Sequence, residues 1–144
     1  MKLLLLLTAA IELGAGLALL GFPSAAVALL LGSPLEAPAA VALGRVAGAA
    51  LLALGVACWL AHCEAQSGAA RGVITAMTVY NLGAVVILSA AGVQLRPVGV
   101  ALWPAVVLHT AMGIGCTACL RRSPLQVTRP NNLQKQSNTE RPQQ

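Results

Sequence analysis

The chain has 144 residues, of which 58% are hydrophobic and only 9% are charged. Soluble domains carry charged side chains at about a quarter of their positions, so a water-soluble fold of this sequence would lack a polar surface. Aromatic residues make up 3% of the chain, and the apolar content is mainly Leu, Val and Ala, which suits helices packed closely in lipid. The formal net charge is +5, but most of the basic residues flank apolar segments or lie in the tail. That distribution argues against nucleic acid as a partner.

The sequence predicts an all-α fold, an integral membrane four-helix bundle. A helix rises ~1.5 Å per residue and needs roughly 20 apolar residues to cross a hydrocarbon core of about 30 Å. Four runs come close to that length, at residues 3–22, 39–62, 72–92 and 98–120. Pro23 interrupts the first run, and the stretch after it predicts a short interfacial helix that opens at Ser24 and closes at Gly32.

Residues 1–122 are therefore expected to form one transmembrane domain. Beyond Arg122 the composition changes to Pro, Asn, Gln, Ser and Thr, without apolar periodicity, which predicts a disordered cytoplasmic tail at 123–144. Two alternatives concern the N-terminus. The run after Lys2 imitates a signal peptide, although it is longer than the usual ~7–15 apolar residues and contains Glu12. The stretch after Pro23 also fits a long, kinked first span.

Basic residues beside the apolar runs predict the orientation. Lys2, Arg71, Arg121 and Arg122 fall on one side of the membrane and Arg96 on the other. Because Lys and Arg are retained on the cytoplasmic side, both termini are expected in the cytoplasm of a cell with a bacterial-type inner membrane. The lipid bilayer is the expected partner, together with other membrane subunits or further copies of the chain.

A small set of polar residues lies inside the apolar runs. Glu12, Asn81 and His109 fall near the middle of the first, third and fourth runs, and Arg45 falls in the outer part of the second. A charged side chain at the centre of a membrane helix costs ~2.5–3.5 kcal/mol on insertion scales, so these groups need internal partners. We expect an ion pair between Glu12 and Arg45, extended by Asn81, His109 and Tyr80. The cluster acts either as a clamp between helices or as a proton or ligand site.

Small residues on the second run predict close helix packing. Gly44 and Gly48 form a small-xxx-small pair, and Gly55 returns to the same face two turns later. Such a stripe admits another backbone, either from the same bundle or from another subunit.

The four cysteines lie near one membrane boundary in this map. Cys58 and Cys63 end the second run, and Cys116 and Cys119 end the fourth. Free cysteine is a common buried apolar residue, so no metal and no cofactor is the favoured interpretation. The alternative is a soft-metal or thiol redox site. Its candidate ligands are Cys58, His62, Cys116 and Cys119.

The second run carries a family resemblance. The sequence LGRVAG at residues 43–48, followed by LALG at 52–55, resembles the second helix of small DoxX-like four-helix membrane proteins. The break at Pro23 before a short apolar segment ending at Gly32 is similar too. The resemblance covers roughly the first half of the chain and implies fold more than activity, since the family is largely uncharacterised and only some members are similar to subunits of membrane oxidoreductases.

The chain also looks like the small multidrug resistance transporters, because it has four predicted spans and the first span contains a carboxylate, Glu12. In that family the carboxylate exchanges protons for cationic drugs. The sequence departs from that pattern, because Arg45 is expected to neutralise Glu12 and an aromatic lining is missing.

The functional expectation is a non-enzymatic accessory or interaction component that binds a small apolar ligand. One alternative is a proton-coupled exporter that uses Glu12. The other is a membrane thiol redox or metal-handling protein that uses Cys58, Cys116 and Cys119. Signatures of hydrolases and phosphate loops are missing from the sequence, so catalytic residues cannot be named.

Overall fold

A computed structural model describes residues 1–95 and 97–122. In that part the chain is all-helical, as the sequence predicts. The helices are α1 (Lys2–Gly21), α2 (Pro23–Leu31), α3 (Pro38–Cys63), α4 (Gly68–Gln94) and α5 (Leu102–Arg122). All except the short α2 are long and apolar enough to cross a membrane. The predicted disordered tail at 123–144 lies outside the described residues.

Helix starts follow local backbone chemistry. Pro23 and Pro38 stand in the first turns of α2 and α3, where a missing backbone N–H costs nothing. Ser67 caps α4, because its side chain accepts a hydrogen bond from the Ala70 N–H at 3.1 Å.

The predicted opening of α2 at Ser24 is wrong by one residue. The Ser24 hydroxyl donates to the Leu35 carbonyl at 3.0 Å and so ties α2 to the segment that leads into α3. Gly32 closes α2 as predicted, with φ of 87°, a left-handed conformation that favours glycine.

The last helix begins at Leu102, four residues later than its predicted start at 98. The preceding segment packs against α2 instead of coiling, and the Ala101 N–H donates to the Leu29 carbonyl at 2.9 Å. A Cβ on Gly99 would lie 2.1 Å from the same carbonyl oxygen, so only glycine fits this contact. The segment before Leu102 is therefore apolar because it packs on α2, and it does not extend the last helix.

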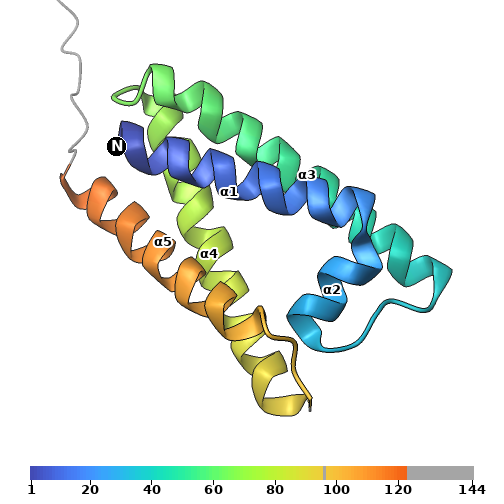
Figure 1. Cartoon of the computed structure of the whole chain (residues 1–144). Coiled ribbons are helices and arrows are strands. Elements are labelled where there is room, and N and C mark those ends of the chain that lie inside the picture. The colour runs from blue at the N-terminus through green and yellow to red at the C-terminus, as the bar shows by residue number, and fades with distance from the viewer. Residues whose placement is uncertain (96, 123–144) are drawn as a thin grey trace, which may run out of the picture.

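The long helices form two antiparallel pairs. α1 lies along α3, and α4 lies along α5 (Figure 1). The pairs meet where the N-terminus and the start of α4 lie, here called the narrow side, and diverge toward α2, here called the wide side (Figure 1). The buried core gathers at the narrow side. Its largest members are Leu5, Cys58, Ile74, Met77 and Cys116.

Candidate functional site

The glycine stripe on α3 sets the register between α1 and α3. A Cβ on Gly48 would lie 2.8 Å from the Gly16 carbonyl oxygen, and a Cβ on Gly55 would lie 2.8 Å from the Leu13 side chain. Gly44, at the wide end of the stripe, faces side chains near α2. The stripe thus joins two helices of the same chain, which answers the question that the sequence left open.

This register corrects the predicted ion pair. With Gly48 against Gly16 and Gly55 against Leu13, Glu12 lies level with the region of Gly55. Arg45 lies about ten residues, or ~15 Å, away along α3. Arg45 is also exposed. The predicted ion pair between Glu12 and Arg45 was wrong, because the relative height of the two groups depends on contacts between helices that a single sequence does not reveal.

Glu12 is buried at the junction of the helices, with 2% of its surface exposed. Tyr80 of α4 and Cys58 of α3 are neighbours of its carboxyl group. Its Oε2 atom is buried and has no hydrogen-bond partner among the described residues. The carboxyl group therefore lies beside the Tyr80 phenol, and the expected cation Arg45 is not its partner.

The structure brings Tyr80, Asn81 and His109 together between α4 and α5. The His109 Nδ1 lies 2.8 Å from the Asn81 Oδ1, and the Tyr80 ring meets the His109 ring edge-on with centroids 5.6 Å apart. Together with Glu12 these groups form a polar track. It runs from the buried carboxyl through the phenol to the imidazole.

The hydrogen bonds of Asn81 determine which nitrogen of His109 carries the proton. The Asn81 Nδ2 donates to the Met77 carbonyl at 2.7 Å, and a carbonyl can only accept, so the amide nitrogen must face it. The amide oxygen therefore faces His109, and the Nδ1 of the imidazole must be the donor. In neutral His109 the Nε2 is then a lone-pair acceptor, and it has no hydrogen-bond partner among the described residues.

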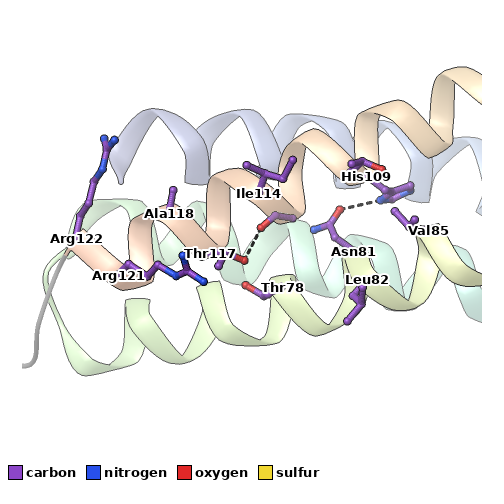
Figure 2. A pocket seen from close by; sticks show the side chains of 12 residues that line it. Thr78, Asn81, Leu82, Val85, His109, Ile114, Thr117, Ala118, Arg121 and Arg122 are labelled. Atoms are coloured by element: carbon purple, nitrogen blue, oxygen red, sulfur yellow. Dashed lines mark hydrogen bonds between the residues drawn. The ribbon is translucent and has the colours of Figure 1, made fainter.

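A groove of about 540 Å³ runs along the surface between α4 and α5 (Figure 2). We call it the α4–α5 groove. From α4 it is lined by Thr78, Asn81, Leu82 and Val85. From α5 its lining includes His109, Thr110, Gly113, Ile114, Thr117 and Arg121. Its size lies within the ~300–1,000 Å³ range of small-molecule sites.

The hydroxyls inside the groove are available as acceptors. The hydroxyls of Thr78, Thr110 and Thr117 each donate to a carbonyl of their own helix, at 2.9, 2.8 and 2.8 Å. Their oxygens keep lone pairs, as does the Nε2 of His109. The interior can therefore accept hydrogen bonds from a ligand but offers it few donors. Arg121 supplies donors at the narrow end, where its side chain points along the groove toward Thr117 and Thr78 (Figure 2).

The cysteines do not form the predicted alternative metal site. Cys58 and Cys116 are buried in one core cluster, whereas Cys63 is exposed and Cys119 is half-buried. His62 sits at the end of α3, and its Nδ1 donates to the Trp59 carbonyl. In the part of the chain that the structure describes, no three His, Cys, Asp or Glu side chains are grouped to hold a metal ion.

Sequence reasoning missed the groove. A signal for it exists, because Thr78, Asn81 and Val85 follow helical spacing on α4, and His109, Gly113 and Thr117 follow it on α5. The spacing alone does not identify a groove, because it does not show that these two helix faces lie opposite each other. Comparisons of the chain with protein families, with curated proteins and with solved structures found no match.

Proposed function

We propose that this protein is a non-enzymatic membrane component that binds a small, largely apolar molecule in the α4–α5 groove. The observation that carries the proposal is that His109 lines a groove of about 540 Å³ while its Nε2 has no hydrogen-bond partner among the described residues. An acceptor in an apolar setting costs free energy when it stays unpaired. A ligand with a hydroxyl or N–H group at the depth of His109 would satisfy it, while the ligand's apolar body would lie against Leu82, Val85 and Ile114.

The groove lies between two helices that are long and apolar enough to span a membrane, so we expect the ligand to enter sideways from lipid. This route suits an accessory component that holds a hydrophobic molecule for other membrane subunits. We include in the proposal that both termini face the cytoplasm of a bacterial-type inner membrane. Lys2, Arg71 and Arg121 support this, because all three lie at the narrow side. The resemblance to DoxX-like proteins stays part of the proposal.

The test is photolabelling with a long-chain alcohol that carries a diazirine in its chain. The purified protein in lipid nanodiscs is irradiated, and the labelled peptides are mapped. Label is expected on the segments around Thr78–Val85 and His109–Thr117, and His109→Ala is expected to reduce it several-fold.

A groove-filling variant gives the matched comparison. A Cβ on Gly113 would meet only the Asn81 Cβ, at an ordinary 3.6 Å, so a side chain can start there, and Gly113→Leu is expected to extend into the groove. Gly14→Leu is the control, because nothing lies within 4 Å of a Cβ at that position on α1. Labelling spread evenly over all lipid-facing helices, and unchanged in Gly113→Leu, would refute ligand binding in the groove.

A second candidate is proton-coupled export of a cation through Glu12. The observation that favours it is the buried Oε2, which has no hydrogen-bond partner in the described part of the chain, combined with the distance of Arg45, the expected neutralising cation. An unpaired carboxylate in lipid is costly and tends to mark a functional pathway. The test is uptake of ethidium by proteoliposomes under an imposed proton gradient. Equal transport by the wild type and Glu12→Gln would reject this candidate.

A further inference from the structure

The narrow end of the α4–α5 groove differs chemically from its interior. The interior carries acceptors and apolar side chains, whereas the narrow end carries Arg121 and Arg122. No Asp or Glu is among the residues that line the groove in the described part of the chain. A guanidinium has five N–H donors and no acceptor, so its natural partner is a carboxylate or phosphate.

The two arginines point in different directions. Arg121 extends back along the groove toward Thr117 and Thr78, while Arg122 points away from it (Figure 2). Both arginines line the groove, but only the Arg121 side chain runs along it. The pair offers an internal comparison with the same charge at nearly the same height.

A third arginine, Arg71, lies at this height on α4. Asn81 faces Gly113 across the two helices, and this register places Arg71 level with the C-terminal end of α5. Arg71 also lies two turns before Thr78 on the same face of α4. Its Nη1 is buried without a hydrogen-bond partner among the described residues. Basic side chains from both α4 and α5 therefore lie at this level.

We infer that the ligand of the α4–α5 groove is a long-chain anionic amphiphile whose acidic group binds Arg121 and whose hydrogen-bond donor binds the Nε2 of His109. The inference rests on the proposed function and adds the chemical class of the ligand. His109 and Arg121 are separated by ~18 Å along α5, and the Arg121 side chain points back to shorten that span. A single extended chain with a polar group at each end fits this geometry.

The experiment compares two probes of the same length by native mass spectrometry of the full chain in a neutral detergent. The probes are 12-hydroxydodecanoate and 1,12-dodecanediol, which differ only in one terminal group. The acid is expected to bind about fivefold to tenfold more tightly, the gain from one partly exposed charge-assisted hydrogen bond. Higher salt is expected to reduce the gain, because exposed charges are screened.

Single-charge variants assign the gain to one side chain. Arg121→Gln is expected to make the two probes bind equally, Arg121→Lys to keep part of the difference, and Arg122→Gln to reduce it less than Arg121→Gln does. Lys2→Gln is the control, because Lys2 is exposed on α1 at the narrow side, away from the groove. Circular dichroism of each variant verifies that the helices are intact.

The outcomes distinguish ligand binding in the groove from the anionic character of the ligand. If neither probe binds, the proposed function fails. If both probes bind the wild type equally, or if the preference for the acid survives Arg121→Gln, only the inference about the anionic group is overturned. Displacement of both probes by millimolar inorganic phosphate would indicate a free-anion site and would also overturn it.

Discussion

The Nδ1 of His109 donates to the Oδ1 of Asn81 across 2.8 Å and joins α5 to α4 near the middle of both helices. Asn81 is almost fully buried, at 1% exposure, and its amide nitrogen is fixed by the Met77 carbonyl. The imidazole is therefore held in one orientation and one tautomer. This bond fixes which His109 nitrogen the groove offers to a ligand.

The energetic weight of this bond can be measured with a double-mutant cycle. Asn81→Ala and His109→Ala are each expected to lower the free energy of unfolding, by about 1–2 kcal/mol, since each leaves the other group unpaired. The coupling energy is expected near ~0.6 kcal/mol, the average for hydrogen bonds between membrane helices. Unfolding in SDS, followed by circular dichroism, gives both numbers. Strictly additive effects would show that the bond does not form in the membrane.

The contact between Gly16 and Gly48 predicts a strong steric effect. Gly48→Val would place a Cβ within 2.8 Å of the Gly16 carbonyl oxygen, so α1 and α3 must separate. We expect a loss of about 1–3 kcal/mol or more, as for other overpacked contacts. The control is Gly14→Val, on the face of α1 where a Cβ meets no atom within 4 Å. Equal stability of the two variants would show that α1 and α3 are not paired as described.

Thiol reactivity tests both burial and orientation. Cys63 is exposed, Cys119 is half-buried, and Cys58 and Cys116 are buried. A membrane-impermeant maleimide is expected to label Cys63 first and to reach Cys58 and Cys116 only after denaturation. Because Cys63 lies at the narrow side, its labelling only in everted vesicles would support cytoplasmic termini. Rapid labelling of Cys58 in the native protein would contradict the packing of the core.

Glu12 is expected to reduce stability. Its buried Oε2 has no partner among the described residues, and a charge at this depth costs ~2.5–3.5 kcal/mol on insertion scales. Glu12→Leu is therefore expected to raise the free energy of unfolding by about 1–2 kcal/mol, as buried charges replaced by apolar residues often do. Tyr80→Phe is the companion variant, since it removes the hydroxyl and leaves the carboxyl without that partner. A less stable Glu12→Leu protein would reveal favourable contacts of the carboxylate.

The number and approximate limits of the spans could be predicted because apolar length alone decides which helices cross a membrane. The start of α5 could not be predicted, because residues 97–101 are as apolar as a span but pack on α2 through Gly99 and Ala101. Depth could be estimated for Glu12, Asn81 and His109, and the structure does bring this set together with Tyr80. The height of Arg45 relative to Glu12 depends on the Gly16–Gly48 contact. The α4–α5 groove depends on how two helix faces meet. Neither the relative height of Arg45 nor the groove can be predicted from the sequence of one helix alone.

The pairing of the long helices has a consequence for how the chain comes apart. Each pair is contiguous in sequence, because α1 and α3 precede the loop at 64–67 while α4 and α5 follow it. The two halves meet mainly at the narrow side, and at the other side the Ala101–Leu29 bond joins them. A chain cut within 64–67 should thus yield two fragments that insert separately and reassemble when co-expressed, a split form suited to complementation assays.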